Sequence, residues 1–193
     1  FESLSLKNNY RPRSPNPPEN FFRSVLPFTV LYRRASGYFT SSVFSLFHEE
    51  IIEFAKNGGQ IELVCSPSFT KEDIKALENG YAAVQVANER INSEVEELLK
   101  AAIKSGHVEF LGTLIKLNVL SLKVGIYSDG KGIFHDKTGY FVDKEVNLIS
   151  FRGSANETMM GWSEDGNFET IEVFKSWLSA DAPRVHDHKK YLD

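Results

Sequence analysis

Polar residues in the last third of the chain have the types that phosphoryl transfer through a histidine requires. His135 and Lys137 stand two residues apart, so in an extended strand both side chains point to the same face. Further along, the small-residue turn Gly153-Ser154-Ala155-Asn156 carries a hydroxyl and an amide, and Glu169 follows it. A neutral imidazole, a fixed cation, two uncharged hydrogen-bonding groups and a carboxylate are therefore close together in the sequence.

The composition is that of a globular protein with one well-filled domain. The chain has 193 residues, of which 41% are hydrophobic and 25% charged. The net charge of −4 argues against a basic coat over the whole surface, so a polyanion would need a local patch or a partner. The single cysteine, Cys65, excludes an internal disulfide and favours the cytoplasm. No apolar run reaches about eighteen residues, so no membrane span is expected.

The two ends of the chain differ from its middle. The stretch 8–20 contains four prolines and few apolar residues, which predicts an extended arm rather than part of the core. We therefore expect an arm or linker over 1–20, the main domain over 21–180, and the start of a linker or a following domain over 181–193. The chain begins without Met and ends in a helical pattern, which favours a fragment of a larger protein.

The first part of the domain alternates strands with helices. Residues 35–39 predict a strand that ends in a turn, and Ser41-Ser42 can cap a helix whose apolar residues recur at helical spacing up to Phe54. Asn57-Gly58-Gly59 ends that helix, and residues 60–65 predict a short buried strand. A strand–helix–strand unit of this kind favours parallel pairing.

The middle of the chain predicts two more helices and a strand. Thr70 can cap a helix that Gly80 ends, and residues 81–105 form the longest helical pattern. Gly106 ends this second helix, and residues 108–111 then predict a strand.

The last third predicts consecutive antiparallel strands. Residues 120–127 form one strand, and a turn at 128–132 leads to further strands at 132–143 and 146–151. Together with the alternating first part, this pattern predicts an α/β fold: a mixed β-sheet flanked by helices on both faces.

The joint pattern His-x-Lys followed by Gly-Ser-x-Asn resembles the motif of the phospholipase D superfamily. The chain is most similar to the single-motif nuclease branch, found in restriction endonucleases and in helicase-associated domains of bacterial DNA defence systems. In that branch the motif continues as Asn-Glu-Thr, Gly-Trp and Asn-x-Glu, which here are Asn156-Glu157-Thr158, Gly161-Trp162 and Asn167-Phe168-Glu169. Ser36-Gly37-Tyr38-Phe39 also resembles a strand of nuclease-like members, and the resemblance implies a phospholipase D-like fold.

Carried over residue by residue, the resemblance assigns a role to each motif position. His135 is the expected nucleophile, which forms a phosphohistidine, and Glu169 is expected to orient its imidazole. Lys137 and Asn156 are expected to hold the non-bridging phosphate oxygens, with support from Ser154.

Physical chemistry supports these roles independently. A neutral imidazole, with an unperturbed pKa of about 6.5, can attack phosphorus near neutral pH. A carboxylate on its other ring nitrogen sets the tautomer, and a cation with an amide neutralises charge on the oxygens, so neither a metal nor another cofactor is expected. The leaving oxygen still needs a proton, and one motif supplies only one catalytic histidine. We therefore expect a homodimer in which His135 of each subunit enters one cleft.

Other polar residues are weaker candidates. Asp143 comes one residue later than the Asp of the common motif, so we interpret it as a strand-end or turn residue, with a catalytic supporting role as the alternative. Asn167 and Glu157 are candidates for support, Glu157 otherwise being exposed. Three arginines and a tryptophan either line a phosphate path or are ordinary surface and core residues: Arg33, Arg34, Arg152 and Trp162. His186 and His188 have a spacing seen in metal sites, but no further ligands cluster with them.

The sequence thus favours a metal-independent DNA endonuclease that works as a homodimer inside a larger restriction or helicase protein. The first alternative is a non-catalytic module that keeps the fold for dimerisation or DNA docking. A second is hydrolysis or transfer on lipid phosphodiesters, although no membrane-seeking segment is visible.

Overall fold

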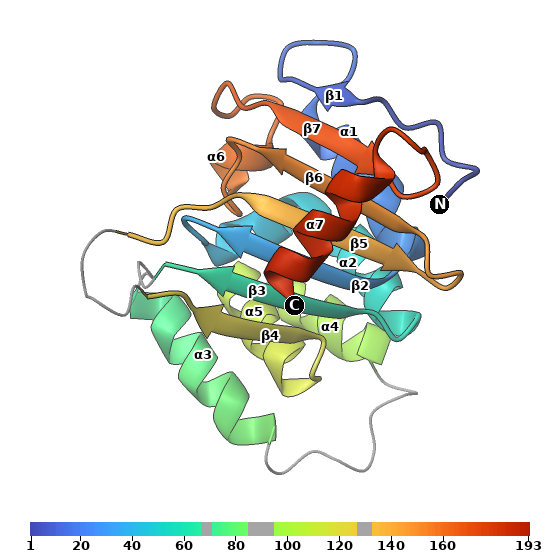
Figure 1. Ribbon diagram of the computed structural model, residues 1–193. Helices are drawn as coiled ribbons and strands as arrows, with labels where there is room; N and C mark the ends of the chain where they lie inside the picture. The colour runs from blue at the N-terminus through green and yellow to red at the C-terminus, as the bar shows by residue number, and fades with distance from the viewer. Residues whose placement is uncertain (67–70, 85–94, 127–132) are drawn as a thin grey trace.

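One mixed β-sheet organises the computed structural model, which describes residues 1–66, 71–84, 95–126 and 133–193 (Figure 1). The strands found in these residues follow the order β1-β7-β6-β5-β2-β3-β4 across the sheet. Their bounds are β1 Asn9–Tyr10, β2 Thr29–Ser36, β3 Gln60–Cys65, β4 Leu120–Val124, β5 Thr138–Asp143, β6 Leu148–Gly153 and β7 Ile171–Lys175.

The first half of the chain forms the parallel part of the sheet. Strand β2 pairs in parallel with β3, and β3 with β4. The expected strand–helix–strand unit is present, but its first strand is β2 and not the predicted 35–39, of which only 35 and 36 lie in β2. Helix α2 (Phe44–Lys56) crosses from β2 to β3, and its chain reverses at Gly58, whose φ of 77° suits glycine. The other helices of this half are α1 (Pro18–Val25), α3 (Lys71–Val84), α4 (Val95–Ser105) and α5 (His107–Lys116), with 3-10 turns η1 (Leu26–Phe28) and η2 (Ser41–Val43).

The second half forms the antiparallel part, as the sequence predicted for the strands that follow residue 132. The prediction is wrong for β4, which was expected to open this antiparallel run. It pairs in parallel with β3, because helices between the two strands return the chain to the same end of the sheet, and β2 and β3 lie between β4 and β5. Strand β5 pairs antiparallel with both β2 and β6, and β6 pairs antiparallel with β7. Because β5 lies next to β2, the two halves form one continuous sheet. The helices here are the short α6 (Met159–Trp162) and α7 (Ala182–Leu192).

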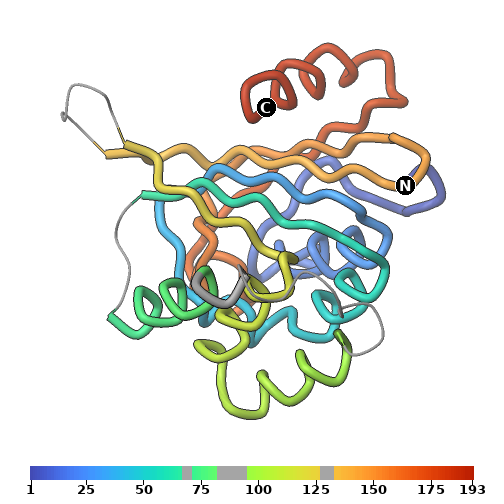
Figure 2. Tube along the Cα trace, turned by 90° about the horizontal axis from the view of Figure 1, so that it is seen from below, coloured from blue at the N-terminus to red at the C-terminus, as the bar shows by residue number. Residues whose placement is uncertain are grey.

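Helices flank both faces of the sheet, which confirms the predicted fold class (Figure 2). Among the described helices, α7 packs on one face, where Val185 joins Tyr140 and Leu148 in a small apolar cluster. The large core fills the opposite face and is rich in aromatic rings such as Phe21 and Phe151. None of the helices in the described part of the chain is long and apolar enough to cross a membrane.

Two predictions for the middle of the chain are wrong. Residues 108–111, expected as a strand, lie in helix α5, because a short apolar run fits a buried helix as well as a strand. Gly80 does not end a helix but lies inside α3. A side chain there would come within 3.0 Å of the Gly112 carbonyl oxygen in α5, so glycine lets the two helices pack closely.

The ends of the chain pack on the sheet rather than standing apart from it. Strand β1, inside the expected arm, pairs antiparallel with β7, and Pro18 begins helix α1, because proline suits the first turn of a helix. Helix α7 covers residues of the segment 181–193 and contacts β5, β6 and β7.

Several predicted features are shorter than expected or outside the described residues. The strand expected over 120–127 ends at Val124. Thr70, the centre of the helix expected over 81–105 and the turn at 128–132 lie outside the described residues; the ends of that helical stretch belong to α3 and α4.

Candidate active site

The sheet topology brings the predicted site residues to one edge of the molecule. Strand β2 ends there, β5 begins there, β6 ends there and β7 begins there, at the left-hand side of the sheet in Figure 1. Thr138 pairs with Arg152, and Gly153 pairs with Ile171, so the segment before β5 and the turn after β6 are neighbours. One prediction needs correction: His135 and Lys137 lie in the segment that precedes β5, not inside a strand.

Three of the predicted catalytic side chains meet around Gly37, directly after β2. A methyl group at Gly37 would lie 2.6 Å from Cδ2 of His135 and 3.1 Å from both Oδ1 of Asn156 and Nζ of Lys137. Glycine is needed here because any side chain would occupy the space in which these groups converge. Sequence reasoning did not assign Gly37 a role, although it lies in the Ser36-Gly37-Tyr38-Phe39 segment that resembled nuclease-like relatives.

Lys137 contacts His135 directly. Its ammonium nitrogen lies 3.0 Å from Nδ1 of His135 and 2.9 Å from the backbone oxygen of the same residue. The imidazole is exposed and packs edge-on against Tyr38, with ring centroids 5.7 Å apart, whereas Lys137 is buried. Burial lowers the pKa of Lys137, and the nearby Arg34 lowers it further, while Asp136 and Glu169 act in the opposite direction.

The turn after β6 holds Ser154 and Asn156 in place. Ser154 Oγ accepts a hydrogen bond from the backbone nitrogen of Thr170 at 3.0 Å. Asn156 Oδ1 accepts one from the backbone nitrogen of Tyr38 at 3.1 Å, so the amide nitrogen of Asn156 remains as a donor for a ligand. At Gly153 a side chain would collide with the Thr170 carbonyl oxygen at 1.9 Å, which explains the glycine of the Gly-Ser-x-Asn pattern.

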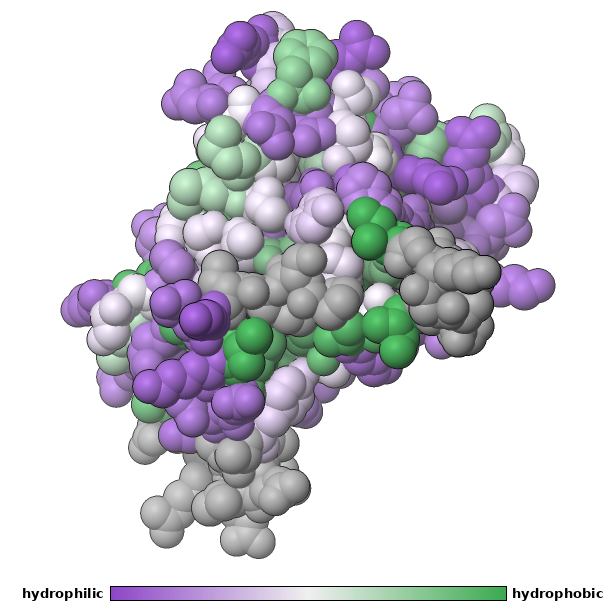
Figure 3. Space-filling model, turned by 90° about the vertical axis from the view of Figure 1, so that its left-hand side faces the viewer, coloured by the Kyte–Doolittle hydropathy of each residue, from purple (hydrophilic) through white to green (hydrophobic). Residues whose placement is uncertain are grey.

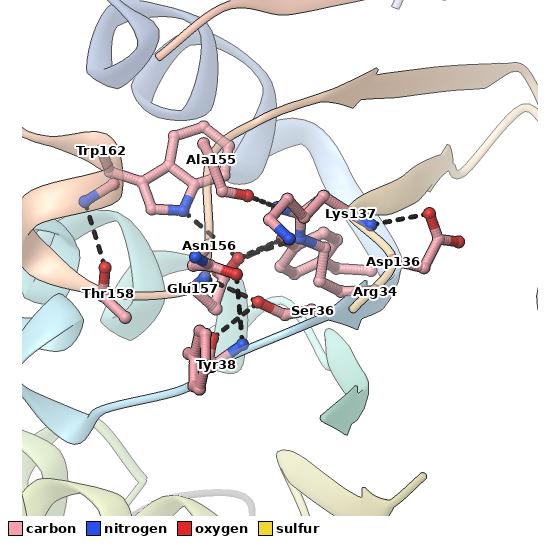
Figure 4. A network of polar contacts seen from close by, with 12 residues as sticks. Arg34, Ser36, Tyr38, Asp136, Lys137, Ala155, Asn156, Glu157, Thr158 and Trp162 are labelled. Atoms are coloured by element: carbon pink, nitrogen blue, oxygen red, sulfur yellow. Dashed lines mark hydrogen bonds and ion pairs between the residues drawn. The ribbon is translucent and has the colours of Figure 1, made fainter. Parts of the chain in front are cut away.

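Glu157 is buried below this turn and ties it to β2 (Figure 4). Its carboxylate accepts hydrogen bonds from Tyr32 Oη at 3.2 Å, Arg34 Nε at 3.1 Å and Trp162 Nε1 at 3.2 Å. Its backbone nitrogen donates to Ser36 Oγ at 2.8 Å. Burial raises the pKa of Glu157, and its donors oppose this shift. The interpretation of Glu157 as an exposed residue is therefore wrong, and its role in support of the site stays a prediction.

Glu169 lies near the site without its predicted contact. It is buried, and Oε1 accepts a hydrogen bond from Nδ2 of Asn167 at 3.3 Å. Among the contacts of the described residues, Nδ1 of His135 meets Lys137 and not Glu169. The predicted orientation of the imidazole by Glu169 is therefore not formed in this structure.

Asp143 is a turn residue, as the sequence analysis favoured. It lies at the far end of β5 from His135, and Oδ1 accepts hydrogen bonds from the backbone nitrogens of Glu145 at 3.0 Å and Asn147 at 2.8 Å. Its alternative role in supporting the catalytic residues is wrong, because the length of the strand separates the two ends.

The four candidates for a phosphate path separate into different environments. Arg34 is 1% exposed and paired with Glu157, and Trp162 is fully buried, so neither meets solvent. Arg33 pairs with Glu62 at 2.8 Å. Arg152 is the most exposed of these four side chains: it is 63% exposed, against 24% for Arg33, and lies 3.6 Å from Asp136.

The surface around His135 is hollowed and mainly polar. A hollow of about 550 Å³ begins at Ile133 and His135 and continues over Asp136, Thr138 and Arg152 towards α7. Figure 3 views this edge of the molecule; an apolar area borders the residues drawn in grey, and the exposed apolar side chains of the flanking segments include Val124, Ile126 and Ile133.

No protein-family model and no curated protein sequence matches this chain. Solved structures do match it. The yeast tyrosyl-DNA phosphodiesterase is 9% identical with a TM-score of 0.48, and the match covers 86% of this chain and 31% of that one. NucT from Helicobacter pylori is 15% identical with a TM-score of 0.45, covering 91% and 84% of the two chains.

A phosphatidylserine synthase from Haemophilus influenzae has a TM-score of 0.50. It is 12% identical, and the match covers 98% of this chain and 40% of the synthase. The chain thus spans less than half the length of the synthase and of the yeast enzyme. At this identity the likeness concerns the fold alone.

Proposed function

We propose that this chain, whose fold is that of the phospholipase D superfamily, is a phosphodiesterase that works through a covalent bond to His135. The observation that carries the proposal is the convergence of His135, Lys137 and Asn156 around Gly37. An exposed imidazole, a buried cation and an amide donor within one small space match the needs of a phosphoryl group under attack.

The resting contact between Lys137 and His135 suggests how substrate starts the reaction. An ammonium that donates to Nδ1 leaves the proton of the neutral ring on Nε2, where it blocks attack. A phosphate anion would draw Lys137 and the amide of Asn156 to its non-bridging oxygens. Nδ1 could then carry the ring proton, and Nε2 would have the lone pair that attack requires. Once Lys137 has moved, the nearby carboxylate of Glu169 is suited to accept a hydrogen bond from the protonated Nδ1.

The reaction then follows two balanced steps. The lone pair of Nε2 forms a bond to phosphorus while the bond from phosphorus to the leaving oxygen breaks, and that oxygen takes a proton from a general acid. Water next attacks the phosphorus of the phosphohistidine: the new O–P bond forms as the P–Nε2 bond breaks, the proton of water goes to the same group, and free His135 is restored. We assign the acid to His135 of a second copy of the chain, in a homodimer with one shared cleft.

We further propose that the diester belongs to DNA and that the chain is one module of a larger restriction or helicase protein. Support comes from the motif resemblance, including the Asn-Glu-Thr and Gly-Trp continuation. In this structure Trp162 of that continuation donates a hydrogen bond to Glu157. The cytoplasm is the compartment in which such a module would act.

Hydrolysis of bis(4-nitrophenyl) phosphate and of plasmid DNA in excess chelator tests the proposal. The wild type should cleave both, and His135→Ala and Lys137→Met should lose at least about 1000-fold in kcat. Acid quenching during turnover should trap a phosphoryl adduct on His135. His186→Ala is the matched control, because His186 is exposed on α7 and should cleave normally. Full activity of His135→Ala would refute the mechanism.

The rival function is a non-catalytic module that binds DNA or dimerises. It is favoured by one observation, that Lys137 rather than Glu169 meets the imidazole. Binding of DNA by a protein that yields neither product nor adduct would establish it. Lipid phosphodiesters are tested in the same series by adding vesicles of phosphatidylserine and phosphatidylglycerol as substrates.

A further inference from the structure

A groove lies between helix α7 and the sheet face formed by β5, β6 and β7. It consists of two hollows, one of about 550 Å³ whose lining includes His135 and one of about 750 Å³ whose lining includes Ser154. Arg152, Asp187 and His188 line both hollows. Each is within the range of about 300–1,000 Å³ that small-molecule sites occupy. Of the candidate site residues, His135 lines the first hollow and Ser154 the second, so the groove adjoins the candidate active site.

Two arginines, Arg152 and Arg184, line the second hollow together with Ser154. Arg152 is two residues before Ser154 and is largely exposed, and its ion pair with Asp136 is long, at 3.6 Å. Arg184 of α7 lies in the second hollow, where its guanidinium is 4.6 Å from the centre of the Phe174 ring. Stacking on an aromatic ring holds the guanidinium in a fixed plane while its edges remain available to a ligand.

His188 adds a ring nitrogen to the same groove as the two arginines. Its Nδ1 lies 3.0 Å from Ser150 Oγ, and its ring meets Phe174 edge-on with centroids 5.7 Å apart. These contacts set the orientation of the ring, which leaves Nε2 for a ligand in the groove.

Carboxylates also line the groove, which argues against a surface that binds only the phosphates of a nucleic-acid backbone. Asp187 and Glu172 are exposed, and Asp136 is occupied by the backbone nitrogen of Lys137 at 2.7 Å. A nucleotide has both kinds of partner, because its phosphate binds guanidinium groups and its base presents amino groups to carboxylates. A lining that combines Arg152 and Arg184 with Asp187 therefore fits a whole nucleotide better than a bare phosphate.

We propose that this groove is a subsite for an unpaired nucleotide next to the scissile phosphate. Its phosphate binds Arg152, and its base lies towards Arg184 and Asp187. An unpaired strand is needed because in a duplex the edge of each base is partly taken by its partner and the base is stacked inside the helix. The inference rests on the proposed function for the location of the scissile phosphate, and it adds the strand state and the residues that hold the flanking nucleotide.

Binding measurements on the inactive His135→Ala protein test the subsite without turnover. Fluorescence anisotropy would compare labelled dinucleotides, single-stranded hexanucleotides and a six-base-pair duplex. The single-stranded hexanucleotide should bind at least about tenfold more tightly than the dinucleotide, and the duplex should show no such gain. Arg152→Gln and Arg184→Gln should each remove about five- to tenfold of the gain. Arg152→Lys, which keeps the charge, should retain part of it.

Lys190→Gln is the matched control, because Lys190 is an exposed cation on the same helix that does not line either hollow. It should change the gain by less than about twofold. The subsite is refuted if the gain survives both arginine substitutions, if Lys190→Gln removes as much of it, or if the duplex gains equally. Hydrolysis of bis(4-nitrophenyl) phosphate, which is too short to fill the groove, reports separately on the proposed function.

Discussion

At the level of single residues, the space beside Gly37 determines how closely the reactive side chains approach one another. His135, Lys137 and Asn156 come from two separate segments, and they meet only because Gly37 lacks a side chain. The same crowding keeps Lys137 buried, which lowers its pKa and makes its charge costly in the folded state. Burial of this cation therefore lowers the free energy of unfolding, while it places a positive charge where a phosphate would bind.

Gly37→Ala tests this crowding. The new methyl group would overlap Cδ2 of His135, so the imidazole must move, and a displacement of this size should lower kcat on the order of 100-fold with a smaller effect on KM. The unfolding free energy should fall by about 1–3 kcal/mol through overpacking. Gly112→Ala is the control, because a methyl group at Gly112 would lie 3.5 Å from its nearest neighbour, the backbone oxygen of Ala76, which is an ordinary contact. Steady-state kinetics and thermal unfolding measure both effects, and unchanged kcat in Gly37→Ala would contradict the account.

Residue types and spacing were enough to predict most of the site but not its contacts. His135, Lys137, Ser154 and Asn156 lie at one edge of the sheet as the motif suggested. The position of Glu157 was not predictable, because its partners Tyr32 and Arg34 come from a strand far earlier in the sequence. The contact between Lys137 and His135 also depends on side-chain packing, which a motif does not specify.

The turn after β6 and the end of β2 act as one unit at the scale of elements. The buried pair of Arg34 and Glu157 joins them, and the backbone of Tyr38 bonds both Asn156 and Glu157. A buried ion pair adds little net stability over apolar residues of similar size, but removal of one partner leaves an uncompensated charge. Its value here is that it sets the position of Asn156 relative to Gly37.

A double-mutant cycle separates these effects. Glu157→Gln leaves the guanidinium of Arg34 buried without its counter-charge and should lower the unfolding free energy by about 3–5 kcal/mol. Arg34→Met combined with Glu157→Gln should recover much of that loss, because the orphaned charge is gone. Activity should stay low in both proteins, since Asn156 loses its support. Urea unfolding measures the cycle; equal stability of the single and double variants would show that the pair is uncoupled.

Predictions for elements succeeded where one periodicity dominated. Strand β3 was expected over 60–65 and is found at Gln60–Cys65. Residues 108–111 were wrongly predicted as a strand because a run of four residues fits the periodicity of a strand and of a helix equally well. In the structure Phe110 and Leu111 are buried as part of helix α5. The prolines at 17 and 18 signalled an irregular arm but instead begin α1, which its contacts with the core stabilise.

The whole molecule carries one histidine at the centre of the site, so the proposed chemistry extends beyond one chain. An imidazole that attacks cannot at the same time donate a proton to the leaving oxygen. His188, which lines the groove, forms a hydrogen bond with Ser150 on the α7 face of the sheet. Burial lowers the pKa of His188, and the nearby Arg152 and Arg184 lower it further. A lowered pKa makes the protonated form, which a general acid must start from, scarcer near neutral pH, and this favours a second copy of His135 as the acid.

Subunit mixing measures whether the site is shared. Wild type and His135→Ala would be mixed in equal amounts and allowed to exchange subunits. If each cleft needs His135 from both subunits, activity per total protein should fall to about a quarter of the wild-type value, because only the homodimers of wild type are complete. Independent sites would retain about half. Mixing wild type with the active His186→Ala variant controls for losses caused by mixing and dilution, and should leave the activity per total protein unchanged.

The antiparallel pairing of β6 with β7 has a consequence for the synthesis of this protein. All of the proposed catalytic residues except Glu169 have been made once the ribosome has passed Asn156, but Ser154 is held by Thr170, and Gly153 pairs with Ile171. A nascent chain that ends before β7 therefore carries the reactive groups without the framework that arranges them. Because domains fold as units, the proposed phosphodiesterase activity should emerge only late in translation, after β7 has been made.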